Sequence, residues 1–299
     1  MEFIVKLNGN NILGSNPLVS VLMTAYNREE YIAEAIESVL ASTYTNFELI
    51  IVDDCSTDNT VNIAKGFEAK DSRIKVYVNE KNLGDYPNRN KAAGYAKGKY
   101  LKYLDSDDKI FPQGIAQLVE VMHSHPESSF GMFSPGSNIV NVLKSQDAIH
   151  DHFFKKSFLD IGPGGTMLRR TFFNEIGRYH VDYGTPGDMY FNLKACCYTS
   201  IVLIPFEFMY YRRHEGQEIN NSYDYLYNNY RYMRDALKDL PLPLNEKQKE
   251  WLIKKNKRRF TVNILKYFTS TFNYTKTAYA VKTAEFTFKD ALIGIFHFK

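Results

Sequence analysis

Residues 18–54 read LVSVLMTAYNREEYIAEAIESVLASTYTNFELIIVDD, and this stretch decides the fold. It begins with an apolar run at 18–25, continues with apolar residues at helical spacing through 28–41, and closes with a second apolar run at 47–52. Short, continuous apolar runs are typical of strands that are buried on both faces, as they are in parallel sheets. The stretch therefore predicts a strand, a helix and a second, parallel strand.

The same alternation extends beyond residue 54. Further strands are predicted at 74–78 and 100–104, with helices at about 61–67 and 88–96 before them. Four strand–helix alternations with short connections predict an α/β fold, in which a mostly parallel sheet is flanked by helices. After residue 108 the strand-like pieces are shorter and less regular, and from residue 223 the pattern is helical. We expect an N-terminal extension, a large α/β domain and a helical C-terminal region, at residues 1–17, 18–216 and 217–299.

Composition indicates an ordinary globular protein, because 44% of the 299 residues are hydrophobic and 24% are charged. The charge is uneven: residues 238–299 hold 13 Lys and Arg against five Asp and Glu, whereas the whole chain has a net charge of +3. The three cysteines are too few and too irregularly spaced for a disulfide framework or a zinc site. The first residues lack the features of a signal peptide. The sequence also has no uninterrupted run of about 18 apolar residues, the length that a membrane-spanning helix needs. We therefore expect a cytoplasmic protein.

Polar residues follow the predicted strands at their carboxyl ends. In open α/β sheets, ligands bind at these ends, where the strand order reverses. The residues at these positions are Thr24, Tyr26, Asn27, Asp53, Asp54, Asn79, Asn82, Asp105, Asp107 and Asp108. We therefore expect the binding site among these side chains.

Three carboxylates stand within four residues in the segment Asp105-Ser-Asp107-Asp108, directly after a buried strand. Carboxylates held so close repel one another unless a cation lies between them. Mg²⁺ and Mn²⁺ take oxygen ligands, typically from one or two carboxylates and from substrate phosphates. The segment therefore predicts a divalent-cation site for a diphosphate, and the alternative is a solvated acidic turn that caps the next helix.

Other positions carry groups that suit a nucleotide. Asp53 and Asp54 can accept hydrogen bonds from a base or a ribose, although a carboxylate there serves equally well to cap a helix. Tyr26 offers an aromatic face and Asn27 an amide, the alternative for the tyrosine being simple packing. Arg89 can pair with a phosphate through two parallel hydrogen bonds, unless it is an ordinary surface arginine.

Four motifs occur in order along the chain. They are Val19-Ser-Val-Leu-Met-Thr-Ala-Tyr-Asn27, Val52-Asp-Asp-Cys-Ser-Thr-Asp58, Asn82-Leu-Gly84 and Tyr103-Leu-Asp-Ser-Asp-Asp108. Together they resemble the family 2 glycosyltransferases, which have the Rossmann-like nucleotide-sugar fold called GT-A. The resemblance extends over about residues 18–214, two-thirds of the chain. Members of the family are inverting enzymes that use Mg²⁺ or Mn²⁺.

The resemblance implies roles for the matching residues on the donor side. Asp54 would contact the base, with Asp53 close by, and Thr24 and Tyr26 would line the base pocket.

The resemblance also implies a metal site. Asp107 and Asp108 would hold the cation and the donor ribose or phosphates, with Asp105 orienting them. The segment Tyr211-Arg-Arg-His214 resembles a late motif whose basic residues approach the diphosphate, and some relatives use the histidine on the metal.

On the acceptor side, the segment Gly164-Gly165-Thr166 resembles the loop that borders the acceptor. Asp188, in Gly184-Thr-Pro-Gly-Asp188, aligns with the catalytic base of the family. Many members have Glu-Asp at this point, whereas here Gly187 precedes the aspartate. The aspartate that would act as the base is still present, but its different neighbour makes the alignment with the family less secure.

We therefore predict an inverting transferase that moves a hexosyl or N-acetylhexosaminyl group from a UDP-sugar to the hydroxyl of a glycan or a lipid-linked glycan. One carboxylate takes the acceptor proton, and a cation stabilises the leaving diphosphate. Two alternatives stay open: a nucleotidyltransferase of nucleotide-sugar metabolism, and a non-catalytic nucleotide-sugar-binding protein. The first usually has a Gly-rich loop after the first strand, which residues 24–28 lack. The absence of a G-x-G-x-x-G sequence there also argues against a dehydrogenase.

The C-terminal region holds a basic run at residues 254–259, followed by Phe260, Ile264, Phe268 and Phe272 at intervals of four. A basic helix with one aromatic face can lie on the anionic inner face of a membrane. The alternative is that the apolar stripe packs on the rest of the protein. A nucleic-acid partner is not expected, because the basic run lacks any recognition module.

Overall fold

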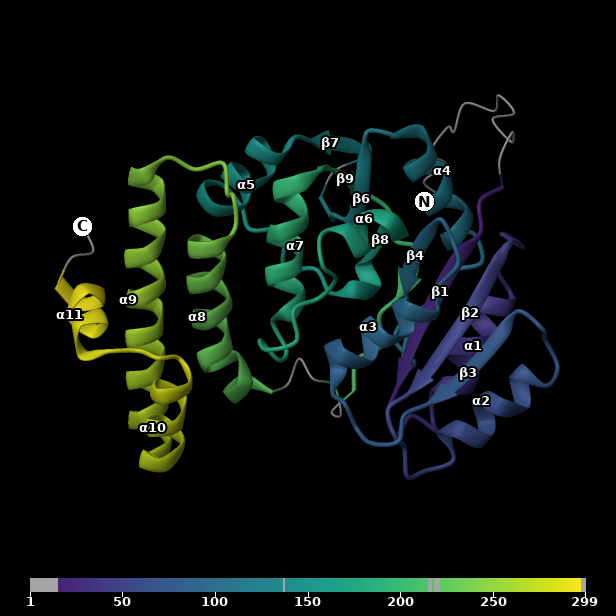
Figure 1. Ribbon diagram of the computed structural model, residues 1–299, viewed down its shortest axis with the longest axis horizontal. Coiled ribbons are helices and arrows are strands. Elements are labelled where there is room, and N and C mark those ends of the chain that lie inside the picture. Colours follow the sequence, from purple (N-terminus) through teal and green to yellow (C-terminus); the bar gives the residue numbers. More distant parts are fainter. Residues whose placement is uncertain (1–15, 137, 215–216, 218–220, 297–299) are drawn as a thin grey trace.

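The computed structural model describes residues 16–136, 138–214, 217 and 221–296. The expected N-terminal extension, 1–17, lies almost entirely outside these residues. A central sheet has helices on both faces, and a group of C-terminal helices stands beside it along the longest axis of the molecule (Figure 1). This arrangement confirms the predicted fold class.

The first half of the chain alternates as predicted. Its elements are β1 (Val19–Ala25), α1 (Ile32–Leu40), β2 (Phe47–Asp53), α2 (Thr60–Glu68), β3 (Ile74–Val78), α3 (Asp85–Tyr95) and β4 (Tyr100–Tyr103). Strands β1 to β4 are parallel. The apolar runs of β1 and β2 are buried on both faces, since each face of the sheet carries helices.

The second half gives shorter strands, and these make the sheet mixed. They are β6 (Ser128–Phe133), β7 (Asn141–Leu143), β8 (Thr166–Arg169) and β9 (Ser200–Ile204). The sheet has the order β3-β2-β1-β4-β8-β6-β9-β7, with β8 antiparallel to both of its neighbours. The chain runs from β1 outward to β3 and then returns to β4 on the other side of β1. The strand order therefore reverses between β1 and β4, where a ligand site is expected.

Four further helices and a small second sheet complete the α/β part. The helices are α4 (Gly114–Ser124), α5 (Ser145–Phe154), α6 (Arg170–Glu175) and α7 (Gly187–Tyr198). The small sheet pairs β5 (Lys109–Ile110) with β10 (Met209–Tyr210) in antiparallel fashion. This pairing brings the chain after the acidic segment next to the late motif that begins at Tyr211.

The C-terminal region contains α8 (Ser222–Asp239), α9 (Glu246–Thr271), α10 (Tyr274–Thr283) and α11 (Phe288–Phe296). Leu237 and Leu240 belong to the same core as Phe191 of α7, so this region is packed firmly on the α/β part. The domain boundary at 216/217 stays a prediction. None of the described helices is both long enough and apolar enough to cross a membrane.

Two residues of the apolar stripe of α9, Phe260 and Ile264, pack inside the protein. Phe260 and Ile264 are buried with Tyr230 of α8, whose ring centroid lies 4.9 Å from that of Phe260. Of the two alternatives for this stripe, packing on the rest of the protein therefore holds for Phe260 and Ile264. An apolar stripe alone does not tell whether a helix packs on protein or lipid, because both environments are apolar.

Candidate active site

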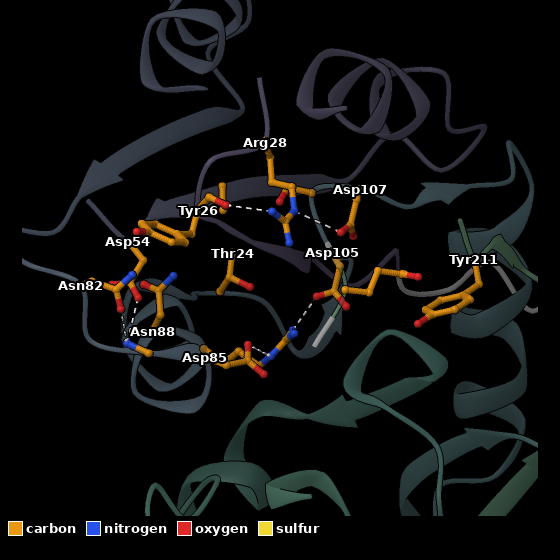
Figure 2. A pocket seen from close by; sticks show the side chains of 15 residues that line it. Thr24, Tyr26, Arg28, Asp54, Asn82, Asp85, Asn88, Asp105, Asp107 and Tyr211 are labelled. Atoms are coloured by element: carbon orange, nitrogen blue, oxygen red, sulfur yellow. Dashed lines mark hydrogen bonds and ion pairs between the residues drawn. The ribbon is translucent and has the colours of Figure 1, made fainter. Parts of the chain in front are cut away.

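A cavity of about 300 Å³ opens at the carboxyl ends of β1, β2 and β4, where the strand order reverses (Figure 2). It is lined by Thr24, Ala25, Tyr26, Arg28, Asp54, Asn82, Gly84, Asp85, Asn88, Arg89, Asp105, Ser106, Asp107, Tyr211 and Gln217. Parallel strands end at one edge of their sheet, so residues that are far apart in the sequence meet there. Five of the predicted donor-site residues are in this wall: Thr24, Tyr26, Asp54, Arg89 and Asp107.

Asp54 holds one rim of the cavity in place. Its Oδ1 accepts hydrogen bonds from the backbone N–H of Leu83, at 2.8 Å, and from the side chain of Asn79, at 2.7 Å. Its Oδ2 accepts the N–H of Gly84 at 2.9 Å. Gly84 has φ +87°, a conformation that a residue with a side chain adopts only with strain. The carboxylate thus fixes the turn of the Asn82-Leu-Gly84 motif.

Two side chains, those of Arg28 and His214, contact the carboxylate of Asp107. Its Oδ2 lies 3.1 Å from Nε of Arg28 and 3.0 Å from Nε2 of His214. The His214 ring stacks on Tyr31, with the ring centroids 4.8 Å apart. Arg28 lines the cavity together with Asp107, and its guanidinium group suits the charge of a diphosphate.

Arg89 is paired with carboxylates of the cavity wall. Its Nε donates to Oδ1 of Asp85 at 2.8 Å. Its Nη1 approaches Oδ1 of Asp105 to 2.7 Å, as an ion pair without hydrogen-bond alignment. Although burial acts against it, these two carboxylates raise the pKa of the guanidinium. The predicted phosphate-binding role therefore competes with a structural one, in which Arg89 joins α3 to the acidic segment.

Five predicted site residues are not among those that line the cavity: Asn27, Asp53, Asp108, Asp188 and His214. The Asp53 carboxylate accepts the N–H of Ser56 at 2.8 Å, and Asn27 accepts the N–H of Thr57 at 2.9 Å, so both side chains fix the loop after β2. Asp108 is buried and accepts the N–H of Arg212 at 2.9 Å. In each of Asp53, Asn27 and Asp108, a side-chain oxygen that we expected to face the ligand accepts a backbone N–H instead.

The predicted metal ligands Asp107, Asp108 and His214 are not gathered into one cluster. Within 16–136, 138–214, 217 and 221–296, no group of three His, Cys, Asp or Glu residues has the arrangement of a metal site. Asp107 does line the cavity, and Nε2 of His214 lies 3.0 Å from its Oδ2. One carboxylate and one imidazole fit a divalent cation that takes its remaining ligands from substrate phosphates and water.

Asp188 stands in the first turn of α7 and is tied to α3 through Tyr86. The Asp188 backbone N–H donates to the hydroxyl of Tyr86 at 2.9 Å, and this hydroxyl donates to the carbonyl of Thr185 at 3.2 Å. A Cβ at Gly187 would lie 2.6 Å from the Tyr86 ring. The departure from Glu-Asp therefore has a steric reason, because the ring occupies the space of a side chain.

The environment of Asp188 suits a base. Burial of the carboxyl group, helped by Asp85, raises the pKa of Asp188 to about 7, against the opposing effects of the N–H of Met189 and of Arg89. Asp85 and Arg89 both line the cavity, so Asp188 acts electrostatically on that site. A carboxylate with a pKa near 7 can both hold and release a proton at neutral pH.

The predicted acceptor loop is packed beside Asp188. It forms a 3₁₀ turn, η1 (Pro163–Gly165), and a Cβ at Gly162 would lie 3.7 Å from Oδ2 of Asp188. The buried ammonium of Lys102 in β4 donates to the carbonyls of Gly164 and Tyr103. Burial lowers the pKa of Lys102 to about 7, against the opposing effect of Asp105 and Asp108. Lys102 therefore ties this loop to the strand that ends at the acidic segment.

The sequence analysis missed several residues of the cavity wall. Arg28 and Asp85 directly follow motifs that were recognised, so their positions carried a usable signal. Gln217 lies beyond the last motif, and only the folded chain brings it to the cavity, with its side chain donating to the carbonyl of Arg212 at 2.7 Å.

Comparison with known proteins gives a consistent result. Residues 20–180 match the family model described as "Glycosyl transferase family 2". The putative teichuronic acid biosynthesis glycosyltransferase TuaG of Bacillus subtilis is 44% identical over 106 residues, which are 36% of this chain and 42% of TuaG. The Escherichia coli protein WfgD, named as a UDP-Glc:alpha-D-GlcNAc-diphosphoundecaprenol beta-1,3-glucosyltransferase, is 48% identical over 105 residues, 35% of this chain and 41% of WfgD. The matched part is thus about two-fifths of these relatives.

Solved structures share the fold. S. aureus TarS 1-349 in complex with UDP-GlcNAc has a TM-score of 0.67 and 23% identity, covering 89% of this chain and 79% of the other. The mannosyltransferase PcManGT from Pyrobaculum calidifontis, in complex with GDP-Man and Mn²⁺, has a TM-score of 0.64 and 13% identity, covering 94% and 84%. At these identities the likeness shows the fold alone.

Proposed function

The chain belongs to glycosyl transferase family 2, and from this premise we propose that it is an inverting enzyme that moves a sugar from a UDP-sugar to an acceptor hydroxyl in glycan assembly. The observation that carries the proposal is the cavity at the strand-order reversal. Asp54 and Asp107 line this cavity. Asp188 interacts electrostatically with Asp85 and Arg89, which also line it. One site can therefore bind the nucleoside diphosphate of the donor and supply the carboxylate that deprotonates the acceptor.

The base of the donor is assigned to the end of the cavity near Asp54. Tyr26 is 45% exposed there, so its ring face is available for stacking on a base, and Thr24 lies beside it. The turn that Asp54 fixes closes the same end. The printed name of WfgD, which is 48% identical over 105 residues, includes UDP-Glc and supports a uridine donor.

The diphosphate is assigned to Asp107 and its partners. Arg28 and His214 bring donors to this point, and Asp107 with His214 would hold a Mn²⁺ or Mg²⁺ ion. When it is bound, such a cation offsets the negative charge of the departing diphosphate. Mn²⁺ is present in the PcManGT complex, which supports the choice of metal.

Asp188 is assigned as the base. Its carboxylate takes the proton of the acceptor hydroxyl while the acceptor oxygen forms a bond to the anomeric carbon. The bond from that carbon to the diphosphate oxygen breaks, and its electron pair leaves with UDP. A single displacement inverts the anomeric configuration, so no covalent sugar–enzyme intermediate is required.

The acceptor is proposed to be a glycan or a lipid-linked glycan. The printed name of WfgD includes a diphosphoundecaprenol acceptor, and that of TuaG includes teichuronic acid biosynthesis. For this chain, we propose an α/β catalytic domain at 18–216 and a helical region at 217–299, with the acceptor loop at η1.

A donor screen tests the proposal. We expect UDP-sugars with Mn²⁺ to raise the melting temperature by several degrees at saturation, and more than GDP- or CMP-sugars do, because a ligand that binds only the folded state stabilises it. Differential scanning fluorimetry measures the shift, and release of UDP with an acceptor mixture confirms turnover. If no nucleotide-sugar shifts the transition, the assignment of the cavity is refuted.

The rate is expected to depend on pH through Asp188. The base works in its ionised form, so kcat/KM should fall about tenfold per pH unit below about pH 7 and level off above it. Since the pKa of the folded state exceeds that of the unfolded state, folding stability contributed by this group is lost as pH rises from about 4 to about 7. A pH–rate profile checks the first effect. The variant Asp188→Glu should shift the pH below which kcat/KM falls. If that pH does not change, the fall is caused by the titration of another group.

A further inference from the structure

The helix α11 has one side packed on α9. A Cβ at Gly294 would lie 2.7 Å from Oγ1 of Thr261 and 2.9 Å from the carbonyl oxygen of Lys257. Asp290, one turn earlier, pairs with the ammonium of Lys257 at 2.8 Å. Gly294 and Asp290 therefore mark the inward side of the helix.

The opposite side of α11 is apolar and open. It carries Phe288, Leu292, Ile295 and Phe296, whose spacing places them on a single face of a helix. These side chains are 80%, 38%, 49% and 70% exposed. Single exposed apolar residues are ordinary, but a continuous stripe of them marks a contact surface. We call this stripe the α11 face.

Basic residues lie near the α11 face. Residues 246–296 contain 11 Lys and Arg against four Asp and Glu. Arg258 of α9 lies against α11, with its backbone N 3.0 Å from the position of a Cβ at Gly294, and Lys289 follows Phe288 on α11 itself. Arg258 and Lys289 are exposed. The surface thus combines an apolar centre with basic flanks.

We propose that the α11 face lies on an anionic lipid bilayer. Aromatic and aliphatic side chains can enter the boundary between headgroups and acyl chains, while flanking Lys and Arg bind anionic headgroups. Interfaces between proteins are depleted in Lys, so this composition favours lipid over a protein partner. The helix lies at the end of the molecule away from β1, β2 and β3 (Figure 1), and the cavity is lined by residues between 24 and 217. Contact with lipid therefore leaves the donor site open.

Vesicle co-sedimentation tests the proposal. The full chain is mixed with large unilamellar vesicles of phosphatidylcholine alone, or of phosphatidylcholine with a third of phosphatidylglycerol. We expect binding to the anionic vesicles that weakens as salt is raised, and at least tenfold weaker binding for the double variant Phe288→Asp with Phe296→Asp. Both rings are exposed, so the variant should keep its melting temperature and its donor-induced shift.

Matched controls separate the α11 face from other effects. Ile139→Asp adds a carboxylate at a 71% exposed apolar residue of the α/β part and should bind vesicles like the unchanged chain. Absence of binding to anionic vesicles, or equal binding by the double variant, would overturn the proposal. A dimer in light scattering that the double variant dissociates would overturn it too, because the stripe would then be covered by a second copy.

Discussion

Replacing Asp188 with Asn is expected to lower the transfer rate by about 10²- to 10⁴-fold while the donor still binds. The amide has nearly the same shape and can still accept the N–H of Met189, which lies 2.7 Å from Oδ1 of Asp188, but it cannot take a proton from an acceptor. The loss should therefore fall on kcat. Initial rates of UDP release and isothermal titration with UDP measure the two quantities.

The same variant makes a second, opposite prediction for stability. Its melting temperature above pH 7 should equal or exceed that of the unchanged protein, because the buried group no longer has to ionise. Asp182→Asn is the matched control, since this aspartate lies in the loop before α7 with a side chain that is 65% exposed. Near-normal turnover by Asp188→Asn would remove Asp188 from the role of base.

Replacing Asp107 with Asn is the second change with a large expected effect. The carboxylate balances Arg28 and His214 and is the one predicted metal ligand in the cavity wall. Loss of its charge should reduce kcat/KM by about 10²- to 10³-fold, the usual size for removal of one preorganised electrostatic group. In contrast to Asp188→Asn, donor binding should fall as well.

The two variants can be told apart by their response to metal. With Asp107→Asn, Mn²⁺ should no longer increase the thermal shift given by UDP, whereas with Asp188→Asn it should do so normally. Asp147→Asn, at an exposed position in the first turn of α5, controls for the loss of one carboxylate. A Mn²⁺ response that survives in Asp107→Asn would place the cation elsewhere.

Much of the donor half follows from local sequence. The strands β1 and β2 are buried on both faces, so their apolar runs are continuous and easy to recognise. Asp54 and Asp107 come directly after such strands, and parallel strands end at one edge, so their meeting could be predicted. Within that edge, the sequence did not separate Asp53 from Asp54. Their different surroundings follow from hydrogen bonds to Ser56 and Gly84, which form only in the folded loop.

The acceptor half depends on contacts between distant segments. Asp188 meets α3 through the Tyr86 hydroxyl, 102 residues away in the chain. Lys102 binds the carbonyl of Gly164 across 62 residues, and no local pattern indicates that a lysine in a strand will be buried. Such positions are fixed by packing and by the need to pair buried polar groups, which are properties of the whole fold.

The sequence by itself determined the α/β class, the edge of the sheet where the donor is proposed to bind, and the basic character of the C-terminal region. These properties rest on the order of apolar and charged residues along the chain, which is local information. Only the tertiary structure decided which carboxylates face the cavity, why Gly187 precedes Asp188, and that Phe260 and Ile264 of α9 are buried while the stripe of α11 is open. An apolar side chain gains the same free energy from any apolar neighbour, so its partner is known only when every element has its place.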